Sequence, residues 1–249
     1  MDQPKRVFPQ EYTYDEKGSE IFEKIMQSTD YYICSCEQNM MAANKQAIIE
    51  TMPSEFNIVD MGAGSGIKTF QLVEEALRVS KTVRYVPVDI SAKSNELLKR
   101  NFKDLFPNVK SVIISGVFEE GLKYIKDNVT GQSLYLFLGA TIGNFDRLKS
   151  ERFLMEMCKM MKPNDHVLLF IDLIKDFEVI LKAYHNEFDT EFELNILERV
   201  NRELDSNFDL KTFYSHKSFD VNEKCVKHYL VSRLEQDVNI QSFGKSFHF

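Results

Sequence analysis

The residues best suited to chemistry lie in one short run, DMGAGSGIKT at positions 60–69. Glycines spaced in this way let the backbone approach a bound ligand closely. A triphosphate-binding loop needs G-x-x-x-x-G-K-[ST], but here Ile67 separates Gly66 from Lys68 and puts the lysine out of register. A dinucleotide-binding loop needs a third glycine at position 67, where the isoleucine again stands. The run therefore fits neither motif.

The form acidic-x-G-x-G-x-G after an apolar run resembles the first motif of class I methyltransferases, which use S-adenosylmethionine. This cofactor has no pyrophosphate, so the missing third glycine is not needed, and Gly62 and Gly64 leave room for its amino acid end and ribose. The next apolar run ends in VPVDIS, which predicts Asp89 at the carboxyl edge of the neighbouring strand. There its carboxylate can accept hydrogen bonds from both ribose hydroxyls. The alternative for Asp89 is a charge beside Ser91, the expected cap of the next helix.

Strand and helix patterns alternate five times along the middle of the chain. Short apolar runs predict buried strands at 56–61, 82–90, 109–115, 133–140 and 165–174. Apolar residues at helical spacing predict helices at 67–80, 91–106, 119–128, 150–161 and 176–188. This alternation predicts an α/β fold with right-handed crossovers and a parallel sheet that has helices on both faces.

The alternation stops after Tyr184. We expect an amphipathic helix at 189–204 and then a two-stranded ribbon around the turn DVNEK. Two helices are also expected before the first strand, at 19–29 and 36–52, and Ser19 is a candidate cap for the first of them.

The chain is therefore predicted to have two parts. Residues 57–185 form the α/β core that binds the cofactor. Residues 1–56 and 186–249 together form an accessory α+β subdomain.

Composition limits the class of partner. The 249 residues are 43% hydrophobic and carry a net charge of −7, which argues against nucleic acid or an anionic membrane as the main partner. No run approaches the length of a membrane span, and the first residues lack the apolar segment of a secretion signal, so we expect a cytoplasmic protein. No cysteine pairs occur at zinc-site spacing, and we expect reduced thiols and no metal site. The four cysteines are Cys34, Cys36, Cys158 and Cys225.

Longer stretches resemble one family, the histidine-specific methyltransferases of ergothioneine biosynthesis, some of whose fungal relatives methylate the amine of a prenylated tryptophan. The resemblance runs from about residue 7 to the end of the chain. The stretches are YTYDEKGSEIFEKI, DYY, LFLGATIGNF at 136–145, DLIKD at 172–176, AY at 183–184 and FELNILERVNRELDSNFD at 192–209.

The resemblance implies a Rossmann-like class I methyltransferase core with an added substrate subdomain. It implies an S-adenosylmethionine-dependent N-methyltransferase that acts on the α-amine of an amino acid, with L-histidine converted to its trimethylated betaine, hercynine. The expected partner is a small amino acid substrate, and the expected state is a monomer or weak oligomer.

The resemblance also implies roles for single residues. The family's substrate carboxylate and amine are held by residues that match Tyr31 and Asn144. The residue that matches Tyr184 also reaches the carboxylate, and the one that matches Tyr14 lines the same pocket. The positions that match the family's cofactor site are Gly62, Gly64, Ser65, Lys68, Asp89, Phe118 and Gly139.

Other interpretations of these residues stay open. Tyr31 and Tyr32 can be an aromatic packing pair, and Asn144 can be a turn residue, since IGNFD has turn chemistry. His185 invites a role as general base, but we expect it on a solvated helix face.

The sequence departs from the family pattern in two places. Val117 stands where the family often has an acidic residue for the adenine, and Glu119 or Glu120 is a candidate substitute. The chain stops at SFGKSFHF, where family members continue into a segment that grips the imidazole and completes the sheet. We therefore expect an exposed apolar edge at 165–172, unless the ribbon at 207–233 or a second subunit covers it. A fragment, or a non-catalytic relative that binds cofactor or a protein, is the alternative to an active enzyme.

Overall fold

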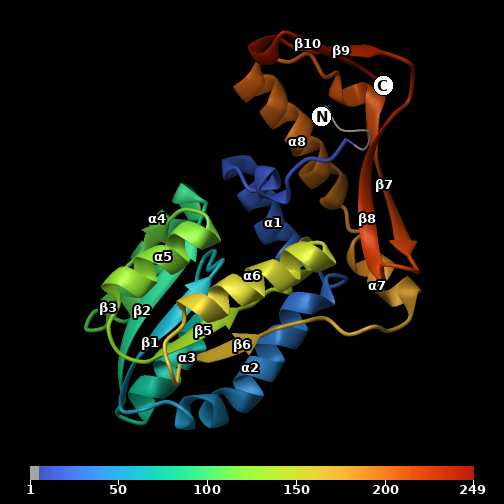
Figure 1. Cartoon of the computed structure of the whole chain (residues 1–249). Coiled ribbons are helices and arrows are strands. Elements are labelled where there is room, and N and C mark those ends of the chain that lie inside the picture. Colours follow the sequence, from blue (N-terminus) through green and yellow to red (C-terminus); the bar gives the residue numbers. More distant parts are fainter. Residues whose placement is uncertain (1–5) are drawn as a thin grey trace. The chain divides into compact units, whose positions relative to one another are not determined.

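The computed structural model describes residues 6–249, which form two compact units (Figure 1). The larger unit is Ile33–Asp172. The smaller unit consists of the described residues up to Tyr32 together with Leu173–Phe249.

The larger unit is built on a parallel sheet with the strand order β3-β2-β1-β5-β6, and β4 also pairs with β2. The order reverses between β1 and β5, which is where α/β proteins bind their ligands, at the carboxyl ends of the strands. The predicted α/β fold class is thus confirmed. The strands are β1 (Glu55–Met61), β2 (Thr82–Asp89), β3 (Lys110–Ser111), β4 (Ile114–Ser115), β5 (Ser133–Phe137) and β6 (His166–Leu169).

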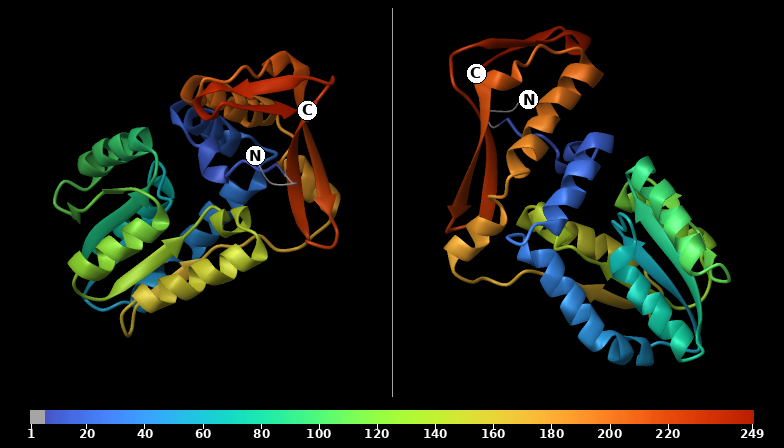
Figure 2. Two further views of the ribbon diagram at one scale, coloured as in Figure 1. Left: turned by 45° about the horizontal axis from the view of Figure 1, so that its top comes forward. Right: turned by 180° about the vertical axis from the view of Figure 1, so that it is seen from behind.

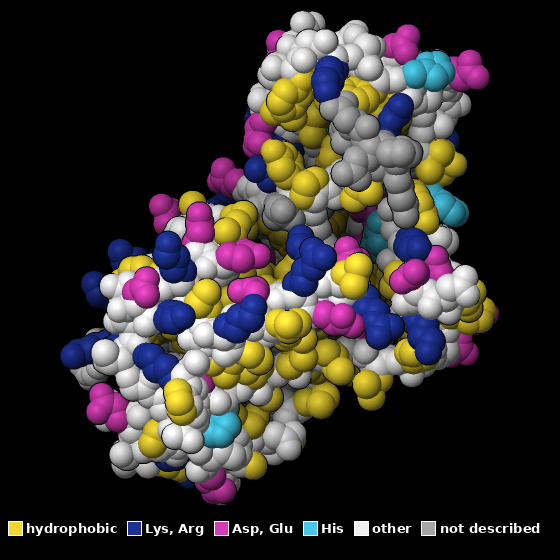
Figure 3. Space-filling model, in the orientation of Figure 1, with side chains coloured by type: hydrophobic (Ala, Val, Ile, Leu, Met, Phe, Trp, Pro, Cys, Tyr) yellow, Lys and Arg dark blue, Asp and Glu magenta, His cyan; other side chains and the backbone are white. Residues whose placement is uncertain are grey.

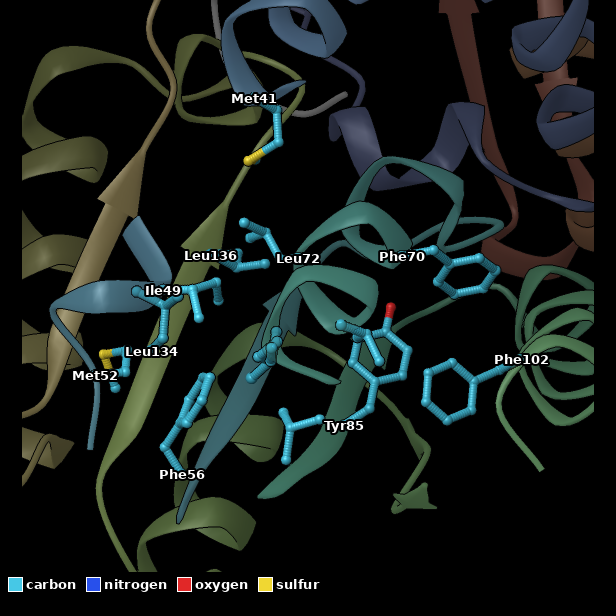
Figure 4. Close-up of a cluster of buried hydrophobic side chains, with 14 of the residues drawn as sticks. Met41, Ile49, Met52, Phe56, Phe70, Leu72, Tyr85, Phe102, Leu134 and Leu136 are labelled. Atoms are coloured by element: carbon cyan, nitrogen blue, oxygen red, sulfur yellow. The ribbon is translucent and has the colours of Figure 1, made fainter. Parts of the chain in front are cut away.

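Helices cover both faces of this sheet (Figure 2). Because side chains alternate along a strand, Phe56 and Ile58 of β1 enter one core, while Val59 and Met61 enter the other. The first core, shown in Figure 4, packs against α2 (Tyr32–Glu50), α3 (Ile67–Arg78) and α4 (Ala92–Leu105). The second packs against α5 (Phe118–Asn128) and α6 (Arg147–Met160), and a short 3-10 turn, η2 (Thr141–Asn144), precedes α6.

A buried carboxylate ties the first two strands to the helix that follows the glycine run. Asp60 of β1 is 2% exposed and accepts hydrogen bonds from the Thr69 hydroxyl of α3 at 2.5 Å and the Tyr85 hydroxyl of β2 at 2.8 Å. Burial raises the pKa of Asp60 to about 6, although both hydrogen bonds and the charge of Lys68 act to lower it.

The smaller unit combines three helices with two antiparallel pairs of strands. Its helix α8 packs against α1 and β7, and its apolar core gathers between α8 and the C-terminal strands. The elements are η1 (Gln10–Thr13), α1 (Glu16–Gln27), α7 (Phe177–Ala183), α8 (Asp189–Leu204), η3 (Leu210–Thr212), β7 (Phe213–Asp220), β8 (Cys225–Ser232), β9 (Asp237–Ile240), η4 (Gln241–Phe243) and β10 (Lys245–His248).

The predicted cap of the first helix is wrong. Asp15, not Ser19, is the N-cap of α1, and its side chain accepts a hydrogen bond from the Gly18 amide at 2.8 Å. The same carboxylate binds Asn195 and Arg202 of α8, at 2.7 Å each, so the cap also joins the two helices. Ser19 lies inside the helix.

The units divide the chain differently from the predicted parts. Residues 33–56 lie in the larger unit, because α2 places Met41 and Ile49 in the core of the sheet. Residues 173–185 lie in the smaller unit. The strand expected at 109–115 is two short pieces, and the one expected at 165–174 ends at Leu169.

The apolar edge that we expected is present. In the described part of the chain, β6 pairs with β5 alone, and Val167 and Ile171 are 38% and 51% exposed. The ribbon strands β7 and β8 pair with each other in a separate sheet.

Acidic and basic side chains are interspersed on the face shown in Figure 3. No helix among residues 6–249 combines the length and apolar character that crossing a membrane requires. All four cysteines are free thiols.

The raised pKa of Asp60 predicts a specific dependence of stability on pH. Between about pH 4 and pH 6 the folded chain keeps a proton that the unfolded chain has released, so its free energy of unfolding falls as the pH rises through this window. Between pH 4 and pH 7 the free energy of unfolding of the wild type should fall by about 2–3 kcal/mol more than that of Asp60→Asn. Urea unfolding at a series of pH values measures this difference.

The control is Asp104→Asn, at an exposed aspartate of α4, which should follow the wild-type pH dependence. A difference between wild type and Asp60→Asn that stays constant with pH would contradict the prediction.

Candidate functional site

The glycine run forms a loop between β1 and α3. Gly62, Gly64 and Gly66 all have positive φ, at 78°, 54° and 77°. At Gly66 a Cβ atom would lie 2.6 Å from the Phe70 ring, so both backbone and space require glycine there. The chain can thus turn sharply and begin α3 directly after the strand.

Asp89 lies at the end of β2 beside this loop. Its carboxylate accepts hydrogen bonds from the Gly64 amide and from the Ser91 amide, each at 2.8 Å. Burial raises the pKa of Asp89, although these hydrogen bonds act to lower it. Ser91 caps α4 through Ser94, so the expected cap is present next to the carboxylate.

The space around the loop fits S-adenosylmethionine. No atom lies within 4 Å of the position of a Cβ at Gly64, so the backbone there faces open space. The half-buried carboxylate of Asp89 adjoins that space and has oxygen lone pairs left for hydroxyl groups. Phe118, the first residue of α5, closes the side next to Gly62, whose Cβ would lie 3.6 Å from its ring. Ser65 is half-buried in the same loop.

Lys68 makes an ion pair that the sequence interpretation missed. Its ammonium lies 2.7 Å from a carboxylate oxygen of Glu37, a fully buried residue of α2. The other oxygen of Glu37 accepts a hydrogen bond from the Gly139 amide at 2.6 Å. Burial acts to lower the pKa of Lys68, but the charge and hydrogen bond of Glu37 together with the charges of Cys34 and Asp60 outweigh it and raise that pKa. Glu37 therefore joins the loop after β1 to the loop after β5.

Three of the expected substrate residues meet in one aromatic cluster of the smaller unit. Tyr31 packs edge-on against Tyr184, with ring centroids 5.9 Å apart, and Phe22 contacts Tyr31 at 6.2 Å and Tyr14 at 5.4 Å. This arrangement agrees with the aromatic packing that the sequence alone suggested for Tyr31, and it also brings three phenol groups together. Asn144, the fourth, ends η2 in the larger unit and is exposed.

His185 is exposed, as expected, but it lies after the end of α7 and not on a helix, and its Nδ1 atom is 2.8 Å from the Leu181 carbonyl oxygen. Val117 is the N-cap residue of α5, and Glu119 and Glu120 are exposed in the first turn of this helix.

The sequence interpretation also missed a buried charged cluster around Glu193 and Lys217. The signal for it is a lysine at an inward position of a strand.

Several known proteins are similar to this chain in sequence. A 27% identical protein, named histidine N-alpha-methyltransferase, from Mycobacterium tuberculosis matches 100% of this chain over 77% of its own length. A protein of the same name from Mycolicibacterium smegmatis is 28% identical and is matched over 76% of its length. Ergothioneine biosynthesis protein 1 from Neurospora crassa is 29% identical over 81% of this chain and 24% of its own.

The family model for histidine-specific, S-adenosylmethionine-dependent methyltransferases matches residues 1–249. This chain therefore belongs to the histidine-specific, S-adenosylmethionine-dependent methyltransferase family.

Proposed function

We propose that this chain methylates the α-amine of an amino acid, with L-histidine as the substrate and hercynine as the final product. The observation that carries the proposal is the hydrogen bond between the Gly64 amide and Asp89, which joins the glycine loop to the carboxylate expected to hold a ribose. The family and the names of two relatives support histidine as the substrate. The cytoplasmic location and the monomeric or weakly oligomeric state stay predictions.

The larger unit would hold the cofactor. Asp89 would accept hydrogen bonds from the ribose hydroxyls, and Gly62, Gly64 and the Gly139 loop would leave room for the rest of the molecule. When bound, S-adenosylmethionine supplies an electrophilic methyl group on a sulfonium centre. We expect Lys68 to act through Glu37, because the ion pair fixes the Gly139 loop.

The amino acid would be held by phenol and amide groups. Tyr31, Tyr184 and Tyr14 would orient its carboxylate, and the role of Asn144 toward the amine stays a prediction from the family resemblance. An α-amine has an ordinary pKa near 8, so an appreciable fraction is already neutral at pH 7 and has a free lone pair. Orientation of that lone pair is then the main requirement, and the reaction does not require a strong general base.

The function is tested directly by mass spectrometry of the purified chain with S-adenosylmethionine and L-histidine. We expect products that carry one, two and three added methyl groups, and every added methyl group should be on the α-nitrogen. A parallel reaction with a pool of the other amino acids identifies a different substrate. Folded protein that binds cofactor and methylates nothing would favour a non-catalytic relative.

Asp89→Asn should weaken binding of S-adenosylhomocysteine about 10- to 100-fold, because an amide replaces one charged acceptor of the ribose hydroxyls. Titration calorimetry measures the dissociation constant. Asp104→Asn, at an exposed carboxylate of the same unit, is the matched control and should bind as the wild type does. Unchanged affinity in a folded Asp89→Asn protein would remove Asp89 from the cofactor site.

Tyr184→Phe should raise KM for histidine about tenfold and change kcat less, because it removes one hydrogen bond to the carboxylate but keeps the ring contact with Tyr31. Tyr124→Phe, at an exposed tyrosine of α5, serves as the control for loss of a phenol group and should leave KM unchanged. Equal KM values for all three proteins would argue that Tyr184 has a packing role only.

A further inference from the structure

The smaller unit contains a cluster of charged side chains that its fold alone does not require. Asp189 and Glu193 lie one turn apart on α8, and Lys217 of β7 lies directly across the ribbon from His228 of β8. Asp189, Glu193 and Lys217 are each less than 10% exposed. Buried charges destabilise a fold unless each is well paired, so a cluster of this kind needs a reason.

The cluster converges on Glu193. The Lys217 ammonium lies 3.2 Å from a carboxylate oxygen of Glu193 and 3.2 Å from one of Asp189. The Ser215 hydroxyl donates a hydrogen bond to Oε2 of Glu193. The Nδ1 atom of His228 lies 2.6 Å from Oε1 of the same carboxylate. Burial would raise the pKa of Glu193, but the hydrogen bonds of His228 and Ser215 and the charge of Lys217 act against it, and that pKa is lowered.

This arrangement fixes the imidazole of His228. A carboxylate only accepts hydrogen bonds, so Nδ1 carries a proton, and in the neutral ring Nε2 is left as an acceptor. Within residues 6–249, Nε2 has no hydrogen-bond partner, and the His228 side chain is 38% exposed. The cluster thus presents one oriented acceptor at the edge of the buried network.

His228 also adjoins the aromatic cluster. Its ring meets Tyr184 edge-on, with centroids 5.5 Å apart and an interplanar angle of 88°. Tyr184 in turn contacts Tyr31. An amino acid whose carboxylate is held by these tyrosines would have its side chain within reach of the imidazole.

We infer that His228, oriented by Glu193, is a specificity group of the substrate site and binds the side chain of the amino acid through Nε2. This inference rests on the proposed function, because that function places the substrate carboxylate at Tyr184. It assigns the substrate to amino acids whose side chain carries an N–H donor, such as imidazole. An apolar side chain would cover Nε2 without pairing it, and a site built to bond a polar group discriminates strongly against such a substrate.

The test compares kcat/KM for L-histidine and L-phenylalanine in the wild type and His228→Leu. The ratio of histidine to phenylalanine should fall about tenfold or more in the variant. His216→Leu is the matched control. His216 lies on β7 beside Tyr229, and because it is next to the inward Lys217 its side chain lies on the other face of the strand. The histidine-to-phenylalanine ratio of this variant should equal that of the wild type. A ratio of rates is insensitive to partial unfolding, because it cancels the fraction of active enzyme.

Glu193 acts through His228 and is a positioning residue. Glu193→Gln should lower the same ratio, and the double variant with His228→Leu should lower it no further than His228→Leu alone. Additive losses would mean that Glu193 has a separate, structural effect.

Binding is followed separately by NMR of histidine-labelled protein with S-adenosylhomocysteine present. Saturation with L-histidine should shift the His228 ring-nitrogen signal, which is assigned by its loss in His228→Leu, and should leave that of His216 in place. If the wild type methylates histidine and His228→Leu has the same histidine-to-phenylalanine ratio of kcat/KM, the inference is overturned and the proposed function stands. Absence of any methylated product overturns the proposed function, and the His228 signal then decides the inference: a shift supports it, and no shift overturns it.

Discussion

The buried carboxylate of Asp60 is the interaction on which the cofactor loop depends. It accepts one hydrogen bond from a hydroxyl of α3 and one from a hydroxyl of β2. It therefore links the strand before the loop, the helix after the loop and the strand that ends at Asp89. With these elements held together, the Gly64 amide meets the Asp89 carboxylate at hydrogen-bond distance. The raised pKa of Asp60 shows that burial opposes its charge, and the two hydroxyl groups are what make a carboxylate tolerable there.

Glu37 extends the same principle across the sheet. One buried carboxylate bonds Lys68 after β1 and the Gly139 amide after β5, on the two sides of the point where the strand order reverses. The loops that follow β1 and β5 are therefore held by the contacts of two buried acids, Asp60 and Glu37.

Local patterns in the sequence predict much of this structure. The helix expected at 189–204 has those bounds, and the glycine run and Asp89 come together as their spacing after two strands indicates. What the sequence does not predict depends on distant pairing. Glu37 meets a residue about a hundred positions away, and α2 joins the larger unit through apolar contacts that helical periodicity cannot assign to a partner. The strands β9 and β10 are four residues long each, which is too short for the sequence to show that they pair with one another.

The position of Lys217 directly across from His228 also constrains how this ribbon can change during evolution. Lys217 is a buried cation on this face of the strand pair, and its ammonium lies 3.2 Å from carboxylate oxygens of both Asp189 and Glu193. Replacement of the histidine leaves Lys217 with both of its acids, so it is a tolerated first step. Loss of Glu193 while Lys217 is present leaves a buried lysine with Asp189 alone. Position 228 can therefore change at a lower cost in stability than position 193 can.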